Sequence, residues 1–319
     1  MIFPLPDPAA LATPAGTARV LRAFGVRPRK RFGQHFLVSQ RVLERLLEAA
    51  ELDPADRVLE VGAGLGTLTA ALAASGCEVV AVEVDQRLIP ILHAVTASFP
   101  TVTIVHGDIM SLDLVELTGR WASAGGPRGS LKIVANLPYG IASILLIRAL
   151  ELLPMLRRAV VTLQAEVADR ITARPASKAY GALTVAVQYR AEAHRVMRVP
   201  PGAFYPRPEV DSTVLRLDVL PERRVRVRDE SLFFAVVRAA FGQRRKVLRN
   251  ALAGVRPEVS PVQVEAACRV AGIDPRRRGE TLSLDAFAAL ADALFEMGAT
   301  AAPPVTAAAS SSPRGRENT

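Results

Sequence analysis

Cysteine and histidine are scarce in this sequence of 319 residues. The two cysteines, Cys77 and Cys268, lie far apart, and the four histidines are scattered without a CxxC or HExxH pair. This spacing argues against a disulfide framework and against the common zinc motifs. We therefore expect two buried free thiols and no bound metal.

Long apolar runs are also missing, because charged residues, proline or glycine interrupt each one before it reaches the length of a membrane span. Residues 1–7 lack the basic and apolar regions of a secretory signal. We expect a cytoplasmic protein with no membrane partner. The length allows one large domain or two modest ones.

Acidic residues are outnumbered, since 31 Asp and Glu stand against 40 Lys and Arg, which gives a formal net charge of +9. The basic residues cluster at 27–31, 223–228, 244–249 and 276–278. One such run is often only a solvated surface, but four of them favour a nucleic-acid partner.

Short apolar runs alternate with helical patterns through the first half of the chain. Parallel strands need crossover connections, so this alternation predicts a doubly wound α/β domain with a mostly parallel sheet. We expect segments 193–199 and 212–219 to close the sheet as an antiparallel pair. The other expected strands are 57–61, 78–84, 102–106, 131–135 and 159–163, and the expected helices are 67–75, 86–97, 112–118, 141–150, 164–172 and 182–189.

The pattern changes beyond Pro221, where only helical periodicity remains, at 231–241, 245–253, 261–271 and 284–297. We expect an α/β domain over 19–220 and a small helical domain over 221–298, whose basic runs make it the part that grasps RNA. Residues 1–18 and 299–319 are rich in Pro and Ala, so we expect a mobile leader and a disordered tail.

Residues 58–69 (VLEVGAGLGTLT) are typical of a buried strand, a tight turn and a helix. The glycines stand at Gly62, Gly64 and Gly66, a GxGxG spacing that differs from the GxGxxG of dinucleotide-binding proteins. Such a turn lets the backbone approach a nucleotide-like cofactor, although the same glycines can simply pack a helix close to a sheet.

Acidic residues end the first three expected strands, at Glu60, Glu83 and Asp108. The carboxyl ends of parallel strands meet at one edge of a sheet, where ligands bind. Glu83 is placed to accept hydrogen bonds from ribose hydroxyls, and Asp108 from the exocyclic amine of an adenine. Each carboxylate alone is commonly a solvated strand end, but together with the glycine turn they indicate an adenosine-containing cofactor.

The fourth strand end, Asn136-Leu137-Pro138-Tyr139, is the most informative motif. The amide oxygen of Asn136 and a backbone carbonyl can accept the two hydrogens of an exocyclic amine, while the Tyr139 ring stacks on a flipped-out base. Prolines around Phe204 are expected to hold its ring opposite Tyr139 and complete a sandwich. The alternative is a loop whose Pro138 and Tyr139 only pack the next helix.

Two other segments allow two interpretations each. Residues 29–37 (RKRFGQHFL) either grip phosphate and present apolar groups to a ligand, or cap the domain with their two phenylalanines. Residues 174–181 (RPASKAYG) are either a basic turn that touches RNA or a solvated loop.

The motifs RKRFGQHFL, LEVGAGLGTLT, VEVD, GDI, NLPYGIAS and PPGAFYPRPEVDSTVLRL carry a resemblance. From about residue 19 to about residue 297, the chain resembles the ribosomal RNA adenine dimethyltransferases of the small ribosomal subunit. The resemblance implies a class I, Rossmann-like methyltransferase that uses S-adenosylmethionine. It also implies transfer of two methyl groups to N6 of each of two adjacent adenines near the 3′ end of small-subunit (16S) RNA, with the immature subunit as partner.

Site residues follow from this resemblance, position by position. The family pattern often has asparagine where His35 stands. The cofactor contacts would be His35, Leu37, Gly62, Glu83, Asp108 and Asn136. The target-base residues would be Asn136, Leu137, Pro138, Tyr139 and Phe204, of which Leu137 and Pro138 act chiefly through their backbone.

Three alternative hypotheses accompany this prediction. The first is an enzyme that methylates one adenine of large-subunit (23S) RNA and confers macrolide resistance. The second is a non-enzymatic RNA-binding assembly factor that keeps the fold, and the third is an NAD-binding oxidoreductase. We expect a monomer.

Overall fold

The computed structural model describes residues 8–122, 130–243, 245–253 and 259–299. The chain divides into two compact units, residues 1–225 and 226–319, close to the boundary expected at residue 220. No helix in the described ranges has the length and apolarity of a membrane span. Cys77 and Cys268 are buried free thiols, as predicted.

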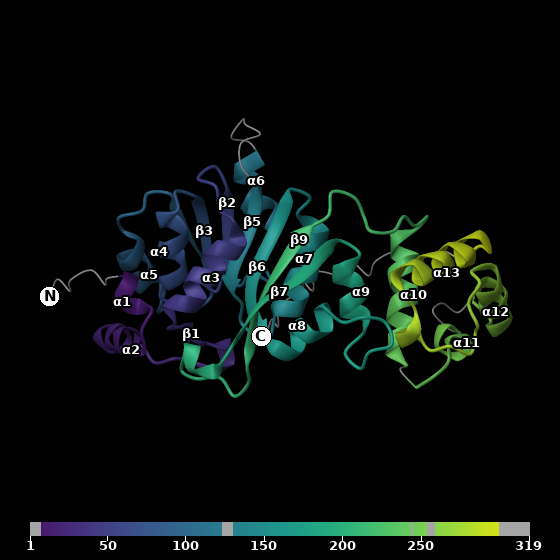
Figure 1. The fold of residues 1–319 in the computed structure, drawn as a ribbon. Helices are drawn as coiled ribbons and strands as arrows, with labels where there is room; N and C mark the ends of the chain where they lie inside the picture. The colour runs from purple at the N-terminus through teal and green to yellow at the C-terminus, as the bar shows by residue number, and fades with distance from the viewer. Residues whose placement is uncertain (1–7, 123–129, 244, 254–258, 300–319) are drawn as a thin grey trace, which may run out of the picture. The chain divides into compact units, whose positions relative to one another are not determined.

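A seven-stranded sheet forms the centre of the first unit (Figure 1). Its strands are β2 (Arg57–Val61), β3 (Glu78–Glu83), β4 (Val102–His106), β5 (Leu131–Asn136), β6 (Leu156–Gln164), β7 (Ala191–Val199) and β9 (Ser212–Val219). The order across the sheet is β4-β3-β2-β5-β6-β9-β7, in which β2 to β6 pair in parallel and β9 runs antiparallel to both its neighbours. The predicted doubly wound sheet and its antiparallel closure are confirmed.

Helices cover both faces of this sheet. They are α3 (Gln40–Ala50), α4 (Thr67–Ala74), α5 (Ile89–Thr96), α6 (Leu114–Ala122), α7 (Ala142–Leu152), α8 (Ala165–Ile171) and α9 (Ala182–Gln188). Successive residues of a strand point to opposite faces, so Val58 packs with Leu46 of α3 and Leu72 of α4, whereas Leu59 packs with Leu145 of α7. Because both faces of the central strands are buried, β3 and β5 are nearly continuous apolar runs rather than alternating ones.

The segment before the sheet is ordered in its described part. It forms α1 (Pro8–Leu11) and α2 (Pro14–Ala23), and the Thr13 side chain caps α2. Leu11 and Leu21 are buried with Ile91 of α5 in one apolar cluster. The expected mobile leader is therefore wrong for residues 8–18, because these side chains have an apolar surface to pack against. Residues 1–7, and 300–319 of the expected tail, lie outside the described ranges.

A second, two-stranded antiparallel sheet joins β1 (Phe36–Leu37) and β8 (Phe204–Tyr205), with Leu37 opposite Phe204. Strands of two residues carry no readable periodicity, so the sequence did not predict them. Alternation along β8 turns Phe204 into the core, where it is 2% exposed, and leaves Tyr205 36% exposed. Phe204 is therefore buried in this structure, and the expectation that its ring lies opposite Tyr139 and completes a sandwich around the base stays a prediction.

The second unit is helical in its described ranges, as predicted. Its helices are α10 (Glu230–Gly242), α11 (Leu248–Leu252), α12 (Pro261–Val270) and α13 (Leu284–Glu296), with a short 3₁₀ turn at Gly279–Thr281. The side chains of Asp229, Ser260 and Ser283 cap α10, α12 and α13 by accepting hydrogen bonds from main-chain N–H groups. Phe233 and Phe287 are fully buried between the helices.

Candidate active site

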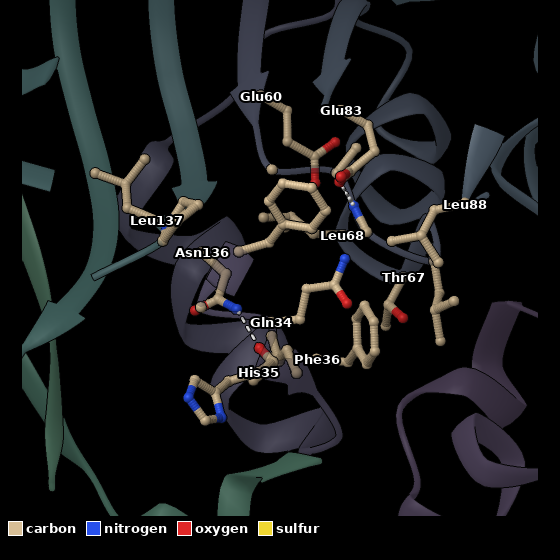
Figure 2. A pocket seen from close by; sticks show the side chains of 18 of the residues that line it. Gln34, His35, Phe36, Glu60, Thr67, Leu68, Glu83, Leu88, Asn136 and Leu137 are labelled. Atoms are coloured by element: carbon tan, nitrogen blue, oxygen red, sulfur yellow. Dashed lines mark hydrogen bonds between the residues drawn. The ribbon is translucent and has the colours of Figure 1, made fainter. Parts of the chain in front are cut away.

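A cavity opens at the carboxyl ends of β2, β3 and β5, next to the point where the strand order reverses (Figure 2). Crossover helices leave in opposite directions from such a point, so a crevice forms there. The lining comes from the glycine turn, from both neighbouring strand ends and from the segment that precedes the sheet. The lining residues include Gln34, His35, Phe36, Leu37, Glu60, Gly62, Gly64, Thr67, Leu68, Glu83, Leu88, Asn136, Leu137, Pro138 and Tyr139.

The glycine turn packs between Pro138 on one side and Phe36 on the other. Gly62 and Gly64 have φ values of 75° and 60°, a left-handed conformation that disfavours a Cβ atom. A Cβ on Gly62 would lie 3.2 Å from Cδ of Pro138, and one on Gly64 would lie 3.1 Å from the Phe36 ring. The turn therefore requires glycine for its backbone and for close approach.

Glu83 ends β3 with a buried carboxylate that the main chain holds in place. Its Oε2 accepts a hydrogen bond from Gly64 N, and its Oε1 accepts one from Asp85 N, both at 2.8 Å. Burial raises the pKa of Glu83, while these two hydrogen bonds act in the opposite direction. Both oxygens are thus fixed in orientation at the cavity wall, and each keeps a lone pair for a ligand hydroxyl.

Glu60, at the end of β2, is 2% exposed and lines the same cavity. Its Oε2 has no hydrogen-bond partner within the described part of the chain. Burial, together with the nearby negative charge of Glu83, raises the pKa of Glu60 to about 8. The sequence places Glu60 at a strand end, but an acceptor left without a partner beside a cavity is visible only in the structure.

Asn136 ends β5 and joins the sheet to the segment that precedes it. Its Nδ2 donates a hydrogen bond to the main-chain oxygen of His35 at 2.9 Å (Figure 2). Because the amide nitrogen is engaged in this way, Oδ1 is the atom that Asn136 offers as an acceptor. Leu137 N donates to Thr162 O at 3.0 Å, which ties the start of the loop to β6.

Tyr139 is held at two places. Its hydroxyl lies 2.6 Å from Oγ of Ser212, which is fully buried at the start of β9. Its ring stacks on the His35 imidazole, with centroids 5.5 Å apart and planes inclined by 26°. Burial raises the pKa of the Tyr139 hydroxyl, so this group stays neutral.

Gln34 anchors the preceding segment on the end of β3. Its Nε2 donates to Asp85 Oδ2 at 2.9 Å, and its Oε1 accepts from Arg29 N at 2.7 Å. Asp85 also pairs with Arg87 at 2.5 Å. Burial opposes ionisation of Asp85, but the hydrogen bonds from Arg87 and Gln34 outweigh it and lower its pKa to about 2. The segment therefore packs on the domain and also lines the cavity with apolar groups, while its grip on phosphate stays a prediction.

Most predicted site residues meet in this cavity, and two lie outside its lining. Asp108 is exposed beyond the end of β4, where its Oδ1 accepts a hydrogen bond from Met110 N at 2.9 Å. Phe204 packs in the core beside Leu37. Glu60, which the sequence marks as a strand-end carboxylate, lines the cavity as well, and the anchoring pair of Gln34 and Asp85 is an addition to the predicted set.

The donor set of this cavity fits S-adenosylmethionine. Glu83 presents fixed acceptors to hydroxyl groups, and the unpartnered oxygen of Glu60 suits a cationic group, which both the sulfonium and the ammonium of this cofactor supply. Glycine backbone and the apolar side chains of Phe36, Leu68 and Leu88 form the remaining wall. The sheet has one antiparallel strand, β9, inserted between β6 and β7, and the GxGxG turn lines the cavity at its edge. These features together define a class I S-adenosylmethionine-dependent methyltransferase.

Comparison with known proteins identifies the family. Residues 25–293 match the family described as ribosomal RNA adenine dimethylase, and the chain belongs to this family. A protein of Pelotomaculum thermopropionicum named ribosomal RNA small subunit methyltransferase A is 46% identical over 292 residues, which cover 90% of this chain and 98% of that protein. A protein of the same name from Geobacter metallireducens is 45% identical over 278 residues, 87% of this chain and 99% of that protein.

Solved structures agree with this assignment. A dimethyladenosine transferase from Plasmodium falciparum has a TM-score of 0.64 at 22% identity and covers 80% of this chain and 95% of its own, which shows the shared fold. The 23S rRNA methyltransferase ErmE has a TM-score of 0.60 at 26% identity and covers 81% and 99%. The predicted enzyme class and cofactor are confirmed, and the oxidoreductase hypothesis loses its support.

Proposed function

We propose that this enzyme transfers methyl groups from S-adenosylmethionine to N6 of two adjacent adenines near the 3′ end of small-subunit (16S) RNA, during assembly of that subunit in the cytoplasm. The main support for this proposal is that Asn136 and Tyr139 line the same cavity as the buried carboxyls of Glu60 and Glu83. Relatives named for the small subunit, at up to 46% identity over 98% of their length, support the choice of RNA.

The cofactor wall is proposed to consist of His35, Leu37, Gly62, Glu83, Asp108 and Asn136, as the resemblance implies. Glu83 accepts from the ribose hydroxyls, and the unpartnered oxygen of Glu60 faces positive charge. Gly107 N–H donates a hydrogen bond to Glu83 O at 3.0 Å. Asp108, the next residue, therefore lies beyond the end of β4, beside the end of β3, and we expect the adenine amine of the cofactor there. Phe204 contributes from the core, by packing under Leu37.

When bound, the cofactor supplies an electrophilic methyl group on a sulfonium. Asn136 Oδ1 accepts one hydrogen of the target amine, and a backbone carbonyl of the Leu137–Pro138 turn accepts the other, so that the nitrogen lone pair is directed at the cavity. The Tyr139 ring, fixed by Ser212, supports the base by stacking. The amine becomes acidic as the new N–C bond forms, so its proton leaves to solvent without a general base.

The helical unit is proposed to hold the RNA. Some of its cations are committed to partners, as in Arg249 with Glu265 at 2.9 Å and Arg276 with Asp274 at 3.1 Å. Arg245, Lys246 and Arg278 are exposed. Exposed cations of this kind bind phosphate and make the affinity depend steeply on salt.

The deciding experiment is methylation of purified, unmethylated small subunits with labelled S-adenosylmethionine, followed by mapping of the modified positions. Large-subunit RNA is the parallel substrate, because the likeness to ErmE favours it as the second candidate. We expect label only on two adjacent adenines near the 3′ end of small-subunit RNA. Label on a large-subunit adenine would establish the second candidate, and no label on either RNA would favour a non-enzymatic assembly factor.

A further inference from the structure

His35 makes contacts through its main chain and its side chain with different parts of the cavity. The main-chain oxygen accepts the hydrogen bond of Asn136, at the junction with the cofactor wall. The imidazole points away from Glu60, Thr67 and the other labelled residues of that wall (Figure 2). Its contacts are the Tyr139 ring and the main-chain oxygen of Pro206.

The contact with Pro206 fixes the protonation of one ring nitrogen. Nδ1 of His35 lies 2.7 Å from the Pro206 oxygen. A carbonyl oxygen only accepts hydrogen bonds, so Nδ1 carries a proton and donates it. His35 therefore links two loops that are far apart in sequence, the one that contains Tyr139 and the one that follows β8.

We propose that the His35 side chain is a positioning residue for the target base, and that it acts by covering one face of Tyr139 while anchoring the loop at Pro206. This inference rests on the proposed function, in which Tyr139 stacks on the base. Only the main chain of His35 then belongs to the cofactor wall, in contrast to the cofactor contact that the resemblance implies for this position.

The physical argument concerns the freedom of the Tyr139 ring. The hydrogen bond to Ser212 fixes only the hydroxyl, which lies on the long axis of the ring, so this bond alone does not set the plane of the ring. The His35 imidazole stacks on the ring and so helps to set its plane, and we propose that the base stacks on the opposite face. An aromatic side chain fixed before the base arrives loses less conformational entropy on binding, which favours the complex with RNA.

Three substitutions separate the two contacts of the side chain. His35→Phe keeps a ring for Tyr139 but loses the donor to Pro206, His35→Asn keeps a donor but loses the ring, and His35→Ala loses both. We expect His35→Ala to raise KM for unmethylated small subunits about three- to tenfold, the range that the loss of one aromatic stack predicts. His35→Phe should raise KM much less than His35→Ala does, because it keeps a ring that can stack on Tyr139. The Kd for S-adenosylmethionine, measured by calorimetry, should stay within about twofold in all three variants, because the main-chain carbonyl is unchanged.

A double-mutant cycle excludes a general structural defect. In a Tyr139→Ala background the stacking partner is gone, so His35→Ala should add little further loss of kcat/KM. The control is His93→Ala, which removes an exposed histidine of α5 outside the cavity and should leave KM and Kd unchanged. Thermal unfolding checks that each variant is folded.

Two outcomes would overturn the inference. A tenfold rise in Kd for S-adenosylmethionine with KM for RNA unchanged would make the imidazole a cofactor contact. Losses in kcat/KM that simply add in the cycle would remove the link to Tyr139. Failure of the proposed function itself is distinguishable, because the unmodified enzyme would then bind S-adenosylmethionine and yet place no methyl group on small-subunit RNA.

Discussion

The two walls of the cavity are built in opposite ways. The wall at β2 and β3, which is one part of the cofactor wall, presents the two buried carboxyls of Glu60 and Glu83 and lies within residues 57–85. The wall at β5 presents an amide and a phenol that are only half-buried, and three distant segments hold it, through His35, Asn136 and Ser212. One wall is a compact local unit with two titratable carboxyls, and the other is an assembly of distant parts that presents an amide and a phenol.

This difference matches what each wall must bind. Buried carboxyls are costly unless a ligand offers hydroxyls or positive charge, so the first wall is selective for such a cofactor. A neutral wall with one amide acceptor and one aromatic ring accepts an uncharged base without repelling it. Substitutions on one wall should therefore affect mainly one ligand, apart from those of Asn136, which we propose to contact both.

The largest expected effect is that of Asn136→Ala on the reaction. The amide oxygen orients the target amine, so we expect kcat/KM on unmethylated small subunits to fall about a thousandfold, as for the removal of one oriented polar group in an active site. S-adenosylmethionine binding should remain measurable by calorimetry. Turnover near the level of the unmodified enzyme would disprove the role of Asn136.

On the opposite wall, Glu83→Gln should weaken S-adenosylmethionine binding by about a hundredfold, because charged acceptors of ligand hydroxyls are worth more than neutral ones. An amide in this place also turns an NH₂ group toward Gly64 N or Asp85 N, both of which are donors. Calorimetry measures the loss. Small-subunit affinity at saturating cofactor should change little, and a large loss there instead would contradict the separation of the walls.

The buried parallel strands could be predicted from the sequence because their signal is local. β2, β4 and the antiparallel β9 have the predicted bounds. β6 begins at Leu156, before the predicted start at residue 159. The interruption is Arg158, whose Nε donates to Asp218 at 2.7 Å, and a partner so distant in sequence cannot be read from the strand itself.

The same distinction holds for the site. Glu83, Gly62 and Asn136 follow from strand ends, because topology alone brings those ends to one edge. The stacking of His35 on Tyr139 depends on how a distant loop packs, which no spacing encodes. Phe204 shows the same limit, because a motif identifies the residue but only the pairing of β8 with β1 decides which way its side chain points.

Glu60 gives a pH test of the carboxyl wall. Its pKa is raised from 4.5 to about 8 in the folded protein, so between these values the unfolded chain ionises while the folded one does not. Stability is therefore lost as pH rises, and the unfolding free energy of the unmodified protein should decline relative to Glu60→Gln by up to a few kcal/mol between about pH 5 and pH 9. Urea unfolding at several pH values measures this slope, and parallel curves for the two proteins would contradict it.

The smallest expected effect tests the contact between the two walls. Gly62→Ala places a methyl group 3.2 Å from Cδ of Pro138 and on a residue with φ of 75°, so it should lower the unfolding free energy by about 1–2 kcal/mol. Gly140→Ala is the control, in the loop that contains Pro138, because a Cβ there meets nothing within 4 Å. Gly62→Ala should also displace the Pro138 turn and so raise KM for RNA as well as Kd for the cofactor. If only Kd changes, the two walls are mechanically independent, and the neutral wall rests on His35 and Ser212 alone.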